Sequence, residues 1–229
     1  MKKLVWLFLL LVCSAAYAKA PFGLLTNVEN PGDSSPARLL RKIISGERIC
    51  VQVDNSLEPG NNAPYLEMIK QGYNEWFSHT LKAIEDAGRQ EEFADLLPYL
   101  KQGVQVKEAG VDCSGADLVV YVQSLREVRA NCKGPAISCV LMLQDPMLMF
   151  FYPFEGVKSW LVGGKQNIIS HELGHTLGMA DQYKYGRNNS HEIYHTPDIK
   201  QSIMREGSPL TKFGCDDVDG FITTAHNKP

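Results

Sequence analysis

The spacing of apolar side chains predicts one long amphipathic helix in the first half of the chain. Between Tyr65 and Ala87, bulky apolar residues recur three or four positions apart, which places them along one helical face. They are Leu66, Ile69, Tyr73, Trp76, Phe77, Leu81 and Ile84. We expect this face to lie in the protein core. The later segment EEFADLLPYL predicts a second helical piece that ends near Pro98.

Shorter apolar runs predict strands before and after the long helix. ERICVQVD (residues 47–54) alternates apolar and polar residues, as a half-buried strand does. The later strands are expected in GVQVKEA (103–109), ADLVVYVQS (116–124), VLMLQ (140–144) and MLMFFYPF (147–154). Near the C-terminus, CDDVDGFITTAH (215–226) starts with acidic residues and predicts a final helix. The pattern as a whole predicts a single α+β domain.

The first eighteen residues have the organisation of a secretory signal peptide (residues 1–18). Lys2 and Lys3 precede the apolar run LVWLFLLLV, and the small-residue pattern Ala16-Tyr17-Ala18 follows it. We predict cleavage after Ala18 and a secreted or periplasmic location. The apolar run is shorter than the roughly 20 residues that span a bilayer, so no stable membrane association is expected after signal removal.

The segment after the signal peptide predicts an N-terminal arm or short propeptide over residues 19–45, because proline, glycine and polar residues dominate it. Residues 46–229 are then one domain. The formal net charge is −3, and no dense Lys/Arg cluster is present outside the signal peptide. This charge pattern excludes a basic surface for nucleic acid, and we expect a monomer.

The mature chain keeps five of the six cysteines, and disulfides persist in an exported protein. They are Cys50, Cys113, Cys132, Cys139 and Cys215. Two bridges at most can form within the chain, which leaves one cysteine over. Cys132 and Cys139 are the easiest local pair, while the remaining connectivity stays open. No CxxC spacing occurs, so a zinc site built from cysteines is not expected.

The segment HELGHTLGMAD (residues 171–181) carries the predicted chemistry. His171 and His175 are four residues apart, so on a helix both imidazoles lie on one face and can bind one zinc ion (Zn2+). Glu172 is turned away from the ligand direction and can deprotonate a water molecule on the metal. Gly178 can adopt the left-handed conformation that ends a helix. The resulting bend would bring Asp181 to the metal as third ligand.

This pattern, HExxHxxGxx followed by histidine or aspartate, resembles the zinc signature of the metzincin peptidases, and its aspartate form is similar to the snapalysin type. Ser202-Ile203-Met204 is similar to the metzincin Met-turn, which would make Met204 a structural floor beneath the metal. The resemblance implies a mixed twisted sheet packed on a long helix and an active-site helix, followed by the Met-turn and a C-terminal helix. Glu206 stands where some metzincins have a tyrosine, so assistance by that tyrosine is not available.

The resemblance implies a zinc-dependent endopeptidase that hydrolyses peptide bonds in polypeptide substrates. The chemistry agrees, because zinc lowers the pKa of its bound water to about 7 and polarises the scissile carbonyl. Glu172 would take the water proton and transfer it to the leaving amine. No covalent intermediate is required, and no GxSxG pattern of a serine hydrolase occurs in the sequence.

Two alternatives stay open. A second HExxH, His191 to His195, lies among polar residues and is followed by Pro197, which favours a loop. Glu192 within it would be the third ligand in a gluzincin arrangement, as in thermolysin, but the poor helical potential around it argues against this. The other alternative is a secreted zinc-binding domain without turnover. Glu172 favours the enzyme, because a structural zinc site has no use for a general base.

Overall fold

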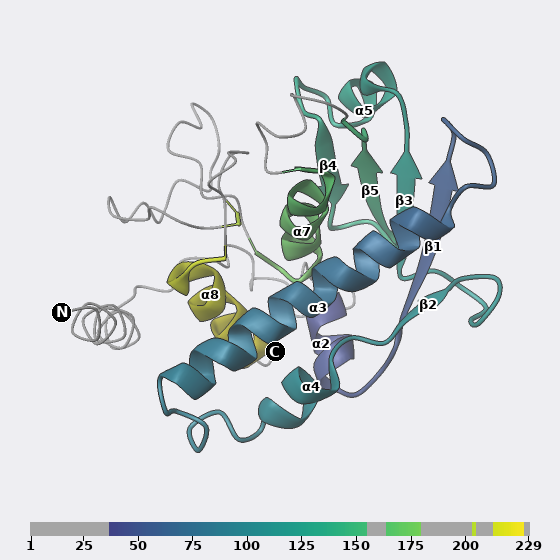
Figure 1. Cartoon of the computed structure of the whole chain (residues 1–229). Coiled ribbons are helices and arrows are strands. Elements are labelled where there is room, and N and C mark those ends of the chain that lie inside the picture. The colour runs from purple at the N-terminus through teal and green to yellow at the C-terminus, as the bar shows by residue number, and fades with distance from the viewer. Residues whose placement is uncertain (1–36, 155–163, 180–202, 205–212, 227–229) are drawn as a thin grey trace.

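A mixed five-stranded sheet with helices packed against it forms the described part of the protein (Figure 1). The computed structural model describes residues 37–154, 164–179, 203–204 and 213–226. The strands are β1 (Ile49–Asn55), β2 (Val106–Glu108), β3 (Leu118–Val122), β4 (Ser138–Leu141) and β5 (Met147–Phe151). The helices are α2 (Arg38–Ile44), α3 (Ala63–Asp86), α4 (Leu97–Gln102), α5 (Leu125–Asn131), α7 (Gly164–Thr176) and α8 (Cys215–His226). The expected α+β class is confirmed.

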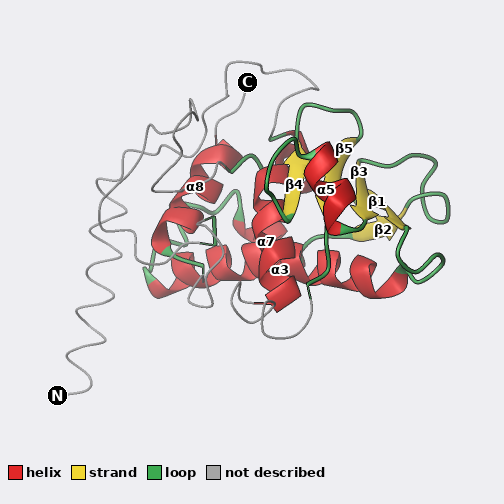
Figure 2. Ribbon diagram, turned by 90° about the horizontal axis from the view of Figure 1, so that it is seen from above, coloured by secondary structure: helices red, strands yellow, loops and turns green. Residues whose placement is uncertain are grey.

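The sheet has the strand order β2-β1-β3-β5-β4. Strands β2, β1, β3 and β5 run parallel to one another, whereas β4 pairs antiparallel with β5. Strand β4 is the last strand in this order, so it forms one edge of the sheet. In both views α7 lies between the sheet and α8 (Figures 1 and 2). This arrangement places the edge strand β4 beside α7, the helix that carries the HELGH motif.

The long helix expected near residues 65–87 is α3, and its predicted apolar face forms much of the core. Pro64 lies in its first turn, where a missing backbone N–H is not needed. Five of the predicted positions are fully buried: Ile69, Tyr73, Trp76, Phe77 and Ile84. Leu66 and Leu81 are partly buried at the margins of this face. The helical periodicity therefore identified the core face correctly.

One prediction about the smaller helices is wrong. Pro98 does not end a helix but lies in the first turn of α4, and the residues before it form turns. The expected arm of residues 19–45 includes α2, whose Leu39, Leu40 and Ile43 are buried in the core. The folded region therefore begins before residue 46, because three apolar side chains of α2 are removed from water. The predicted signal peptide lies outside the described residues.

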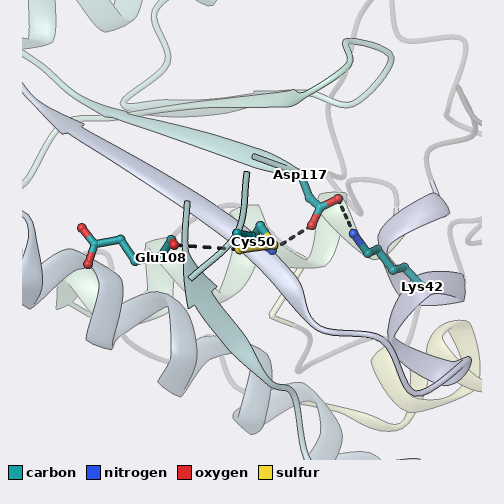
Figure 3. Close-up of a disulfide and its surroundings, with 5 residues drawn as sticks. Lys42, Cys50, Glu108 and Asp117 are labelled. Carbon is teal, nitrogen blue, oxygen red and sulfur yellow. Dashed lines mark hydrogen bonds and ion pairs between the residues drawn. A yellow bond between two sulfur atoms is a disulfide. The ribbon is translucent and has the colours of Figure 1, made fainter. Parts of the chain in front are cut away.

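The Asp117 side chain links α2 to the sheet through hydrogen bonds (Figure 3). One carboxylate oxygen, Oδ1, accepts a hydrogen bond from Lys42 Nζ of α2 at 2.7 Å. The other, Oδ2, accepts one from the backbone N–H of Cys50 in β1, also at 2.7 Å. Because Asp117 immediately precedes β3, this single carboxylate joins one helix to two neighbouring strands.

Two disulfides join strands of the sheet to neighbouring segments. Cys50 of β1 is bonded to Cys113 in the loop after β2, and Cys132 at the end of α5 is bonded to Cys139 of β4. The local Cys132–Cys139 pair predicted from the sequence is confirmed. The fifth cysteine outside residues 1–18, Cys215, begins α8, but its side chain lies outside the described part of the structure. Among the described helices, none is long and apolar enough to cross a bilayer.

Candidate active site

Helix α7 carries His171, Glu172 and His175 in the predicted arrangement. The two imidazole rings lie next to each other, with centroids 5.0 Å apart and planes at 89°. Their four-residue separation thus places both rings on one helical face, as expected.

Both imidazoles are oriented by backbone carbonyls. His171 Nδ1 lies 2.8 Å from the carbonyl oxygen of Ile203, and His175 Nδ1 lies 2.8 Å from that of Met179. A carbonyl oxygen only accepts hydrogen bonds, so each Nδ1 carries a proton, and in the neutral imidazole each Nε2 carries the lone pair. Histidines that ligate metals are held in this way by partners on the other ring nitrogen. The two carbonyls have no side-chain signature, and the sequence did not identify them.

Gly178 follows the end of α7 and adopts the predicted left-handed conformation. Its φ is +92°, and the amides of Gly178 and Met179 donate to the carbonyls of His175 and Gly174 at 2.9 Å each. The turn carries the Met179 carbonyl back to the His175 ring. The chain is therefore reversed directly after the second histidine. Asp181, the predicted third ligand, lies outside the described residues, as does the second HExxH.

Met204 lies against the backbone of α7 between the two histidines. Its side chain is fully buried. A Cβ added at Gly174 would collide with Met204 Sδ and would lie 2.6 Å from Cζ2 of Trp76. The glycine of HELGH, Gly174, thus lets two large side chains pack directly on the helix. This position agrees with a structural role for Met204 beneath the histidines.

Asp217 connects α8 to the turn that contains Met204. The carboxylate has no solvent exposure, and its Oδ2 accepts hydrogen bonds from the backbone N–H of Ile203 at 2.9 Å and of Gly214 at 2.8 Å. Ile203 in turn offers its carbonyl to His171. A chain of hydrogen bonds therefore runs from α8 to the first histidine. The sequence suggested only a favourable interaction of this acid with the helix dipole.

Glu172 is buried beside the edge strand of the sheet, with 4% of its surface exposed. Its Oε1 accepts a hydrogen bond from the hydroxyl of Ser138 in β4. Its Oε2 is buried and has no hydrogen-bond partner among the residues that the structure describes. A buried carboxylate oxygen is destabilising unless a donor or a bound group satisfies it, so this oxygen is a candidate for contact with a bound group. Ser138 was not among the predicted site residues.

The opposite face of α7 is fixed by aromatic residues of α3. The indole N–H of Trp76 donates to the carbonyl of Ser170 at 2.8 Å, and the Tyr73 hydroxyl lies 2.8 Å from Thr176 Oγ1. Burial raises the pKa of Tyr73 well above its ordinary value, so the phenol remains neutral. Both contacts combine a large buried ring with a satisfied polar tip, which orients α7 on the core.

The donor set fits a zinc ion in part. Two Nε2 atoms with fixed tautomers and an adjacent buried carboxylate are suitable for a metal and a general base. Within residues 37–154, 164–179, 203–204 and 213–226, no cluster of three or more His, Cys, Asp or Glu residues completes a metal site. In comparisons with known proteins, no family model, no curated protein and no solved structure matches the chain.

Proposed function

We propose that the protein is an exported zinc-dependent endopeptidase of metzincin type that hydrolyses peptide bonds in polypeptides. The orientation of the two histidines carries the proposal. Each Nδ1 donates to a backbone carbonyl, which directs the Nε2 lone pairs to metal binding. The adjacent buried carboxylate supports an enzyme, because a structural zinc site needs no base.

His171 and His175 would hold the zinc through Nε2, with Asp181 as the third ligand. Three protein ligands leave a position for water and substrate, as catalytic zinc requires. When bound, the metal supplies Lewis-acid chemistry, polarising a peptide carbonyl and making a water molecule more acidic. Met204 would support the ligand helix from below through its contact at Gly174.

Glu172 would perform the proton transfers through Oε2. This oxygen accepts the proton of the attacking water and then delivers it to the nitrogen of the leaving amine. Burial of the carboxylate strengthens its electrostatic interactions with reacting groups, because water screens them less. The water attacks the peptide carbonyl directly, so no covalent bond to the protein forms.

Export is supported by two independent features. Residues 1–18 have the charge, apolar run and small-residue site of a signal peptide. The chain also forms two disulfides, which are typical of proteins outside the reducing cytoplasm. The proposed substrate is therefore an extracellular or periplasmic polypeptide.

The Glu172→Gln variant tests the proposal, because it keeps the size of the side chain and removes the base. With casein as an unstructured substrate, we expect kcat to fall about 10²- to 10⁴-fold while zinc content stays at one equivalent. Glu75→Gln is the matched control, since Glu75 also accepts a serine hydrogen bond beside α7. Equal hydrolysis by Glu172→Gln and wild type would refute the mechanism. Zinc binding without hydrolysis in either protein would identify a non-catalytic binding domain.

A further inference from the structure

The two oxygens of the Glu172 carboxylate have different surroundings. Oε1 accepts the hydrogen bond of the Ser138 hydroxyl, whereas Oε2 has no hydrogen-bond partner among the described residues. Both residues are buried, with 9% of Ser138 and 4% of Glu172 exposed. One oxygen is therefore anchored to the sheet, and the other is left to interact with a reacting group.

We infer that Ser138 is a positioning residue for Glu172, holding Oε1 so that Oε2 faces the reacting water. The inference rests on the proposed function, because it assigns Glu172 as the base. A glutamate side chain has a broad terminal torsion, and its carboxylate rotates readily when nothing holds it. A displacement of about 1 Å in a catalytic group can lower the rate about 10²-fold. The hydrogen bond from Ser138 is therefore expected to increase kcat by fixing the Glu172 carboxylate.

Contacts with β5 and α5 fix the backbone of β4 around Ser138. Ser138 pairs with Phe151 of β5, a fully buried core residue. The preceding Ile137 carbonyl accepts a hydrogen bond from the amide of Tyr152 at 3.1 Å. The following residue, Cys139, is tied to the end of α5 by its disulfide. Ser138 thus has fixed backbone on both sides, although it belongs to the edge strand.

The test compares Ser138→Thr with Ser138→Val, which have the same shape and β propensity and differ in the hydroxyl. With casein as substrate, Ser138→Val is expected to lower kcat about 10- to 100-fold, the usual effect of losing such a supporting partner. KM and zinc affinity should change less than about threefold, because neither substrate binding nor the histidines depend on this hydroxyl. Ser138→Thr should recover most of the lost kcat.

Ser170→Ala is the control for loss of a partly buried serine–glutamate hydrogen bond. Ser170 donates to Glu75 on the opposite face of α7, away from Glu172. This variant is expected to lower thermal stability without the kcat loss of Ser138→Val.

Equal kcat values for Ser138→Thr and Ser138→Val would overturn the positioning role. An equal loss of kcat in Ser170→Ala would also overturn it, because the effect would then reflect packing. Neither result affects the proposed function, which is tested separately by the Glu172→Gln variant.

Discussion

Replacing Asp217 with alanine is expected to weaken both the fold and the metal site. The carboxylate is fully buried and accepts hydrogen bonds from the backbone N–H groups of Ile203 and Gly214. Alanine has no side-chain acceptor, so the N–H groups of Ile203 and Gly214 both lose this hydrogen bond. A buried polar group that loses its partner costs about 1–3 kcal/mol, and the Gly214 bond is only partly buried, so the two donors together cost about 3 kcal/mol. This is a large fraction of the stability of an ordinary domain, about 5–15 kcal/mol.

The same variant should reduce zinc affinity through His171. Ile203 accepts the Nδ1 hydrogen bond of His171, so a displaced Ile203 backbone releases the imidazole from its orientation. Loss of such supporting partners lowers metal affinity about 10- to 100-fold. Asp217→Asn keeps one oxygen acceptor and should show smaller losses of both stability and affinity.

Chemical denaturation of chelator-treated protein gives the stability change without the contribution of bound metal. A zinc titration of folded protein then gives the affinity change separately. Asp86→Ala removes an exposed carboxylate paired with Lys82 and is expected to change stability by less than about 1 kcal/mol. The reasoning is refuted if Asp217→Ala unfolds within about 1 kcal/mol of wild type and binds zinc equally well.

Three further predictions concern other residues. Gly174→Ala should lower the unfolding free energy by about 1–3 kcal/mol, because the new methyl group meets the Trp76 ring; an unchanged Tm contradicts this packing. Asp181→Ala should weaken zinc binding, and Glu192→Ala should not; the reverse result identifies Glu192 as the third ligand. Burial lowers the pKa of His79 below its ordinary 6.5, so the folded state binds protons less readily than the unfolded state. Stability should therefore fall as pH drops through 6.5, and His79→Gln should reduce that fall.

Local sequence patterns predicted the longer elements well. Helix α3, strand β3 and helix α8 each have a periodicity that follows from their burial on one or both sides. Helix α8 matches the predicted bounds of 215–226. These elements can be predicted from the sequence because the apolar periodicity lies within the residues of each element.

The errors arise where a local sequence pattern has two interpretations or where tertiary contacts determine the bounds of an element. Pro98 suits the first turn of a helix as well as a position after its end, and the structure has the former. Helix α5 is short and has one buried residue, Val128, so its apolar periodicity is weak. The capping box formed by Ser124 and Glu127 was the available signal for its start. Strand β4 begins at Ser138 because it pairs with β5.

Some residues of the candidate site could be predicted from the sequence, and others could not. His171, Glu172 and His175 are recognised from their spacing on one helix, because the ligand geometry is local. Ser138 and Asp217 reach the site from a distant strand and the final helix, so no short motif contains them. Their contributions depend on the packing of β4 and α8 around α7.

In the proposed mechanism, hydrolysis requires zinc held by His171 and His175. The most direct measurement removes metal from the mature protein with a chelator, dialyses the chelator away and follows casein hydrolysis as zinc is added back. We predict that activity disappears on stripping and returns in full at one equivalent of zinc, with no recovery in a His171→Ala/His175→Ala variant. Full hydrolysis by the stripped protein, with its zinc content verified as negligible, would contradict the account.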